Sequence, residues 1–299
     1  MTNSTDKEGG TMTLEKGLAA FADTLLGKNR SETTVRAYKT DVLQFIAFLH
    51  ENNVAVTHIC DVTKVDVLEY LTALSKRGLT GVVRARKLSA LREYFRFCES
   101  LGLLEKSPTA GIDTPKREKR SRHYLRSDEF TKMLSLAGGN PRDYAILQVF
   151  LQTGIRVSEL AGLTLTDVDL HKPAITVRGK GNSEREIALE KRGVQALKNY
   201  LAVRPQSLSE IIFLNYQGTP ISERGIRKLV VKYTKNAGIT KRASCHTLRH
   251  TFATYKAEKG VSPFQLQQWL GHANLNTTQI YVHLGKQNAK KIMEQTSLT

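Results

Sequence analysis

Apolar residues recur every three or four positions from Leu14 to Leu101, and this spacing restricts the first third of the chain to packed helices. The pattern breaks into four stretches, at about residues 14–26, 31–52, 63–77 and 80–101. Thr63 and Asp66 have the three-residue spacing of a capping box, which marks a helix start. No strand-like alternation interrupts the stretches. They therefore predict a small bundle of four helices with short connections.

The pattern changes in the second part of the chain. Ser127 and Pro141 are typical of helix starts, and a short helix is expected near residues 156–162. The runs AITVR (174–178) and REIAL (185–189) favour strands, and GKGNSE between them indicates a hairpin turn. A third run, IIFL at 211–214, could complete a small sheet. Helical spacing returns near residues 190–204, 222–237, 247–259 and 262–270.

The length of 299 residues exceeds the usual size of one hydrophobic core and suits two domains. Residues 111–124 (GIDTPKREKRSRHY) have almost no apolar content and indicate a basic linker between them. The expected fold class is mainly α, with a helical bundle first and then a mostly helical domain with a small antiparallel β-sheet. We expect a disordered leader at 1–12, domains at 13–110 and 125–285, and a separate C-terminal segment at 286–299.

The net charge of +17 is most simply explained by a polyanionic partner, a solubilising surface being the alternative. Residues 113–299 carry most of it, with 30 Lys and Arg against 15 Asp and Glu. No stretch has the length and apolarity of a membrane span, and the N-terminus lacks the apolar region of a secretory signal, so a cytoplasmic protein is expected. The cysteines have no CxxC spacing, which predicts buried free thiols at Cys60, Cys98 and Cys245.

Four motifs occur in order in the second part: TGIRVSEL at 153–160, RGKGNSER at 178–185, HTLRH at 246–250, and LGHANLNTTQIYVH at 270–283. Together they resemble the tyrosine recombinase (lambda integrase) family, and Xer-type and transposon-encoded members in particular. The family's Arg, Lys, His-x-x-Arg, His or Trp, and Tyr match Arg156, Lys180, His246, Arg249, His272 and Tyr281.

The resemblance implies a core-DNA-binding, SAM-like N-terminal bundle and a C-terminal catalytic domain. It implies site-specific cleavage and rejoining of double-stranded DNA through a 3′-phosphotyrosyl intermediate and a Holliday junction, with no metal, ATP or organic cofactor. Two protomers would bind the inverted half-sites of each recombination site, and a homo-tetramer would form on two synapsed sites. The alternatives are a type IB topoisomerase, which needs no partner site, and a DNA-binding regulator without catalysis.

The chemistry of phosphodiester transfer can be assigned to the same residues. Charge develops on the non-bridging oxygens, and Arg156 and Arg249 can each donate paired hydrogen bonds to them. The hydroxyl of Tyr281 can form a covalent phosphoryl intermediate if a base or a strong field offsets its usual pKa of about 10. The leaving 5′-oxygen needs a proton, and Lys180 on the hairpin is the expected donor.

Three further residues are expected to support this reaction. His246 would act as an acid or base near the nucleophile, and His272 would hydrogen-bond a phosphate oxygen in the transition state. Glu159, one turn after Arg156, is expected to orient an active-site side chain. Metal ligation by His246 and His250 is the alternative for that pair, but the chain has neither an HExxH glutamate nor a cysteine cluster.

Purely structural roles are the alternatives for the other positions. Arg156 could only pair with Glu159, Lys180 could be an exposed hairpin tip, and Tyr281 could be a half-buried core aromatic. Additional DNA contacts are expected from basic residues of the fourth helix and the linker, namely Arg84, Lys87, Arg92, Arg96, Lys116, Arg117 and Arg120. Residues 286–299 hold apolar positions at helical spacing, which need a surface to bury against. They could fold back on their own domain, but the resemblance to Xer-type recombinases implies that they dock on a neighbouring protomer.

Overall fold

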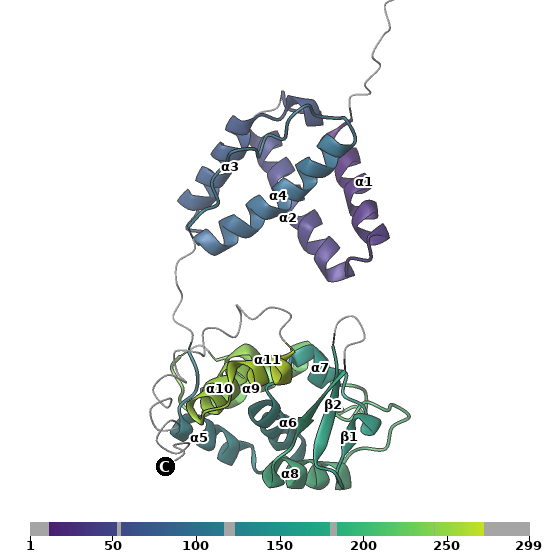
Figure 1. Cartoon of the computed structure of the whole chain (residues 1–299), viewed down its shortest axis with the longest axis vertical. Helices are drawn as coiled ribbons and strands as arrows, with labels where there is room; N and C mark the ends of the chain where they lie inside the picture. Colours follow the sequence, from purple (N-terminus) through teal and green to yellow (C-terminus); the bar gives the residue numbers. More distant parts are fainter. Residues whose placement is uncertain (1–11, 53–54, 117–122, 180–183, 242, 272–299) are drawn as a thin grey trace, which may run out of the picture. The chain divides into compact units, whose positions relative to one another are not determined.

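The computed structural model describes residues 12–52, 55–116, 123–179, 184–241 and 243–271 (Figure 1). The chain divides into two compact units, Met1–Arg120 and Ser121–Thr299, and the boundary falls within residues 111–124. The expected fold class is confirmed, because both units are mainly helical and the second contains one small antiparallel sheet. Within these ranges, no helix is both long and apolar enough to span a membrane.

The first unit contains the four predicted helices, α1 (Leu14–Gly27), α2 (Glu32–Asn52), α3 (Lys64–Lys76) and α4 (Gly81–Ser100), and a 3-10 turn at Ile59–Asp61. Their apolar faces form one core, which includes the fully buried Phe45, Leu88 and Phe95. The capping box predicted at Thr63 is confirmed, since its backbone N–H donates to Asp66 at 2.8 Å. The bundle therefore follows directly from the apolar spacing.

Lys87 is buried, so the expectation that it is exposed on α4 is wrong. Its side chain is 5% exposed, and its ammonium donates to Asp41 of α2 at 2.9 Å and also to Gln44. Asp41 is itself 3% exposed, and Arg86 forms a second ion pair with it. A buried carboxylate needs such compensation, since an uncompensated buried charge is costly. Lys87 is therefore part of the bundle's interior and not of a DNA-contacting surface.

We predict that Lys87→Met lowers the free energy of unfolding by about 3 kcal/mol. This is the low end of the range for breaking a buried ion pair, because Arg86 still neutralises Asp41 in the variant. Urea denaturation of the full chain measures the loss. Lys39→Met, the same replacement at an exposed position of α2, is the matched control. An equally small loss for both variants would contradict the buried charge cluster.

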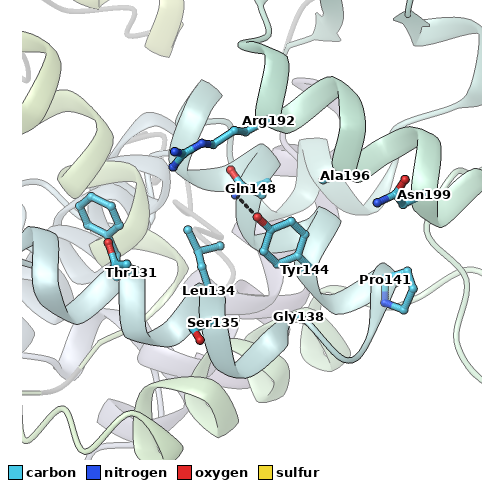
Figure 2. Close-up of a pocket in the computed structure, with 11 residues that line it drawn as sticks. Thr131, Leu134, Ser135, Gly138, Pro141, Tyr144, Gln148, Arg192, Ala196 and Asn199 are labelled. Carbon is cyan, nitrogen blue, oxygen red and sulfur yellow. Dashed lines mark hydrogen bonds between the residues drawn. The ribbon is translucent and has the colours of Figure 1, made fainter.

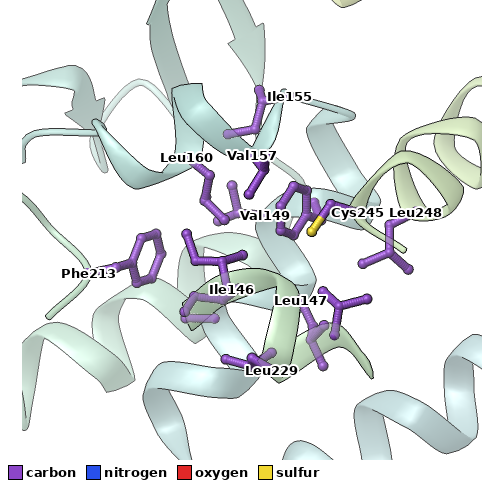
Figure 3. Packing of buried hydrophobic residues seen from close by; sticks show 14 of the residues in the cluster. Ile146, Leu147, Val149, Ile155, Val157, Leu160, Phe213, Leu229, Cys245 and Leu248 are labelled. Carbon is purple, nitrogen blue, oxygen red and sulfur yellow. The ribbon is translucent and has the colours of Figure 1, made fainter. Parts of the chain in front are cut away.

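The second unit is built around helix α6 (Pro141–Thr153), whose Ile146, Leu147 and Val149 are fully buried (Figure 3). Its other helices are α5 (Ser127–Ala137), α7 (Val157–Ala161), α8 (Lys191–Ala202), α9 (Glu223–Asn236), α10 (Cys245–Glu258) and α11 (Pro263–Leu270). They match the predicted helices to within a few residues. Helix α11 packs against α10 and also reaches the sheet (Figure 1).

The sheet has the strand order β1 (Val168–Asp169), β2 (Ala174–Arg178) and β3 (Glu184–Ala188), all antiparallel. The hairpin of β2 and β3 is thus confirmed, but the expected third strand at 211–214 is wrong. That segment makes only isolated bridges, because its buried backbone bonds to several different partners. The N–H of Ile212 donates to Leu163, and the N–H of Leu214 to the hydroxyl of Tyr200.

The expectations for the three cysteines and for the linker are confirmed only in part. Cys98 and Cys245 are buried free thiols, as predicted, but Cys60 is exposed because it lies in the 3-10 turn outside the helical apolar faces. In the segment expected to be a linker, Ile112 is buried in the core of the first unit. Part of that segment therefore belongs to the packed structure of the bundle. The C-terminal segment 286–299 lies outside the described residues.

Candidate active site

Arg156 connects two elements of the candidate site. It lies at the N-cap of α7, and its side chain contacts the C-terminal end of α11. Its backbone N–H and its Nη1 donate to the two carboxylate oxygens of Glu159, at 2.6 and 2.8 Å. Its Nη2 donates to the carbonyl of Gly271 at 2.6 Å, and its side chain is 39% exposed. The structural pairing with Glu159 is therefore present, yet these side-chain bonds use two of the guanidinium's five N–H donors. Glu159 therefore holds the guanidinium of Arg156 in place. That it thereby orients an active-site residue stays a prediction.

Arg249 reaches the same place from α10. Its Nη1 donates to the carbonyl of Gly154 at 2.7 Å and its Nη2 to that of Leu270 at 2.6 Å, and the residue is 8% exposed. Gly154 ends α6 with a φ of +60°, and a Cβ there would lie 2.4 Å from the ring of Phe252. Glycine in the TGIR motif is thus required both by the backbone and by this packing.

A third arginine, Arg185 of β3, completes the arrangement and was not identified from the sequence. Its Nε donates to the carbonyl of Trp269 at 2.8 Å, and its Nη1 and Nη2 donate to Glu159 at 3.1 and 2.8 Å. Three arginines from separate elements therefore bind three successive carbonyls at the C-terminus of α11. That helix end carries partial negative charge and unpaired carbonyls, which cations satisfy.

Among the described residues, Glu159 supplies the carboxylate of this cluster. Burial, the strongest single influence, acts to raise its pKa. The hydrogen bonds and charges of Arg185 and Arg156 outweigh that influence, so that the pKa of Glu159 lies below its usual value. Two guanidiniums thus share one buried carboxylate, and the cluster of Arg156, Arg185 and Glu159 carries a net positive charge that suits a phosphate.

The remaining site residues are placed only in part. His246 is exposed on the first turn of α10, three residues before Arg249 and therefore on the same side of that helix. His250 lies edge-on to Tyr124, with ring centroids 6.3 Å apart. Lys180, His272 and Tyr281 lie outside the described residues. Gly271, which directly precedes His272, is the residue whose carbonyl Arg156 holds.

The basic residues expected to contact DNA differ in their surroundings. Arg96 and Lys116 are exposed, whereas Arg84 and Arg92 are half-buried, and Arg92 donates to Thr114 at 2.9 Å and to the carbonyl of Ile112. The last two candidates, Arg117 and Arg120, lie outside the described residues. Much of Arg92's donor capacity therefore serves the bundle itself.

Helix α9 presents a cationic surface that the sequence reasoning missed. Its exposed residues Arg224, Arg227, Lys228 and Lys232 surround Val231 and line a shallow hollow of about 450 Å³. The signal is the spacing of basic residues at intervals of three and four within ERGIRKLVVK. A further pocket of about 430 Å³ lies between α5, α6 and α8, where Gln148 donates to Tyr144 at 2.9 Å (Figure 2). It contains none of the predicted site residues.

Comparison with known proteins agrees with this arrangement. Residues 123–288 match the model of the phage integrase family, and residues 18–101 match that of the phage integrase N-terminal SAM-like domain. The chain belongs to the phage integrase family. The resemblance inferred from the motifs is thereby confirmed, and the integrase model spans all the positions assigned to catalysis.

Relatives of known type support membership of the phage integrase family. A tyrosine recombinase of Pseudothermotoga lettingae is 36% identical over 91% of this chain and 94% of its own length. Tyrosine recombinase XerC of Thermodesulfovibrio yellowstonii is 35% identical over 91% and 92%. The chain is thus a Xer-like tyrosine site-specific recombinase.

Solved structures with a similar fold include XerA recombinase and lambda integrase. XerA recombinase is similar with a TM-score of 0.53 and 28% identity, over 95% of this chain and 99% of that one. A lambda integrase dimer bound to a COC′ core site has a TM-score of 0.75 and 20% identity, over 89% and 97%, which shows the fold alone.

Proposed function

We propose that this recombinase cuts and rejoins duplex DNA at a specific site by transferring a DNA 3′-phosphate to Tyr281 and back. The observation that carries the proposal is the convergence of Arg156 and Arg249, from separate helices, on the carbonyls of Gly271 and Leu270, directly before His272. Two guanidiniums so placed supply donors for the charge that develops on a phosphate during transfer.

The proposed step balances without an external energy source. The Tyr281 oxygen forms a bond to phosphorus as the bond to the 5′-oxygen breaks, and the phosphotyrosine keeps the energy needed for rejoining. Lys180 gives a proton to the leaving 5′-oxygen, and His246 accepts the proton that the Tyr281 hydroxyl loses. His272 donates to a phosphate oxygen beside Arg156 and Arg249. The 5′-hydroxyl of the partner duplex then attacks the phosphotyrosine and releases Tyr281, and exchange of one strand from each duplex gives a Holliday junction.

The charge distribution supports duplex DNA as the substrate. The chain has a net charge of +17, and the exposed basic face of α9 adds a surface for the phosphate backbone. Solved structures with the same fold include XerH bound to a palindromic difH substrate, with a TM-score of 0.75 and 22% identity. We extend this to two protomers on inverted half-sites and four on two synapsed sites, with residues 286–299 docking on a neighbouring protomer.

Site selection followed by a two-site assay tests the function. Duplexes that the chain retains from a random-sequence pool are sequenced, and the selected site is then placed twice in one supercoiled plasmid. We expect deletion or inversion between the two sites, and neither of these products from a plasmid with one site. Relaxation of a plasmid without the site, and no joined product, would identify a type IB topoisomerase. Binding with no covalent adduct on a nicked duplex would identify a regulator.

A further inference from the structure

Arg185 is a half-buried arginine beside the proposed phosphate site, and the cleavage chemistry above does not use it. It is the second residue of β3, paired with Val177 across the hairpin. Its side chain is 13% exposed, whereas that of Arg178 on the neighbouring strand is 55% exposed. A guanidinium that loses this much hydration is stable only where fixed partners replace the water.

The partners of Arg185 belong to the same cluster as the proposed catalytic Arg156. Arg185 makes two hydrogen bonds to the carboxylate of Glu159 and one to the carbonyl of Trp269. Arg156 bonds to the same carboxylate through its Nη1, at 2.8 Å. A Cβ at Gly271, where φ is +61°, would lie 3.0 Å from Nη1 of Arg185, so the chain before His272 closes directly over this guanidinium.

The charges of this cluster decide what Arg156 can bind. The carboxylate of Glu159 is 6% exposed, and a buried carboxylate holds a neighbouring guanidinium strongly. Without a second cation, Arg156 alone would have to neutralise Glu159, and a phosphate would compete with that carboxylate for it. Arg185 supplies the second cation. One carboxylate and two guanidiniums then leave one positive charge for the phosphate.

We propose that Arg185 is a positioning residue that shares the charge of Glu159 and thereby leaves the guanidinium of Arg156 available to the scissile phosphate. The role rests on the proposed function, because it presumes that Arg156 stabilises the phosphate during cleavage. Arg185 itself touches neither the phosphate nor the nucleophile in this account. Its effect passes through Glu159 and through the C-terminus of α11, which both arginines hold.

The test compares two nicked suicide duplexes that carry the selected site. One has an ordinary scissile phosphate, and the other has a methylphosphonate, in which a neutral methyl group replaces a charged oxygen. Arg185→Ala should slow adduct formation on the ordinary duplex by about 10- to 100-fold, as expected for a displaced oxyanion donor. On the methylphosphonate it should react within about threefold of the wild-type chain, because less charge needs to be neutralised.

Three further variants make the comparison specific. Arg156→Ala should show the same selective rescue. Arg185→Lys keeps the charge and most of the packing but not the forked geometry, so its rate should lie between those of wild type and Arg185→Ala. Lys172→Gln is the control. It breaks an exposed ion pair to Glu186, which follows Arg185 on β3, and it should leave the rates on both duplexes unchanged.

The outcomes separate this inference from the proposed function. Absence of a wild-type adduct on the ordinary duplex contradicts the function itself. If the wild-type chain reacts and Arg156→Ala is rescued, but Arg185→Ala slows both duplexes equally or neither, the charge-sharing role of Arg185 is wrong. If even Arg156→Ala is not rescued, Arg156 does not neutralise the phosphate, and the role of Arg185 through it is overturned.

Discussion

Replacement of Tyr281 by phenylalanine is expected to abolish covalent attachment to DNA while affinity for the selected duplex stays within about twofold of wild type, since phosphate contacts dominate affinity. The change removes one oxygen atom, the proposed nucleophile, and leaves the ring. A denaturing gel of the nicked suicide duplex measures the adduct, and a gel shift under native conditions measures binding. Lost binding together with the lost adduct would indicate a structural role for Tyr281.

Tyr255→Phe is the matched control for this experiment. Tyr255 packs edge-on against Phe130, with ring centroids 5.3 Å apart, and burial raises the pKa of its hydroxyl. A raised pKa opposes formation of a nucleophilic phenolate. The Tyr255→Phe chain is therefore expected to form as much adduct as wild type, and loss of the adduct in this variant would move the nucleophile from Tyr281 to Tyr255.

The second large effect is expected at Lys180. Lys180→Ala should cleave ordinary DNA about 100- to 10,000-fold more slowly, which is the usual contribution of a general acid. Replacement of the leaving 5′-oxygen by sulfur should restore most of the rate, because a thiolate leaves without a proton. Single-turnover cleavage of the two suicide duplexes measures both rates.

The sulfur substrate also separates Lys180 from the arginines. Arg249→Ala is the comparison variant, because a guanidinium that stabilises charge on the non-bridging oxygens is needed whichever atom leaves. Its rate should stay low on both duplexes. Equal slowing of Lys180→Ala on both duplexes would show that Lys180 supports the phosphate and does not supply the proton.

The sequence predicted those parts of the structure that local spacing determines. Apolar periodicity located the helices, and the cap at Thr63 and the proline at Pro141 marked two of their starts, because these signals lie within a few residues of one another. The hairpin was predicted to within one residue from its two β-prone runs. Arg156 and Glu159 were paired correctly because they lie one helical turn apart.

The errors concern contacts between residues far apart in the chain. Lys87 was placed on the surface because its partner Asp41 lies on another helix, and helical spacing alone gives no sign of that carboxylate. Arg185 was missed because its bond to Trp269 spans 84 positions. The segment 211–214 has the composition of a strand, yet its backbone bonds to Leu163, Tyr200 and Ile221 in turn. Tertiary packing decides such cases, and propensity does not.

Identification of the amino acid joined to DNA tests the central claim most directly. The wild-type chain is trapped on the nicked suicide duplex and digested with trypsin, and the DNA-linked peptide is sequenced by mass spectrometry. We predict a peptide that contains Tyr281, joined through its hydroxyl to a 3′-phosphate of the cleaved strand. Attachment through another tyrosine, or to a 5′-phosphate, would contradict the proposed reaction.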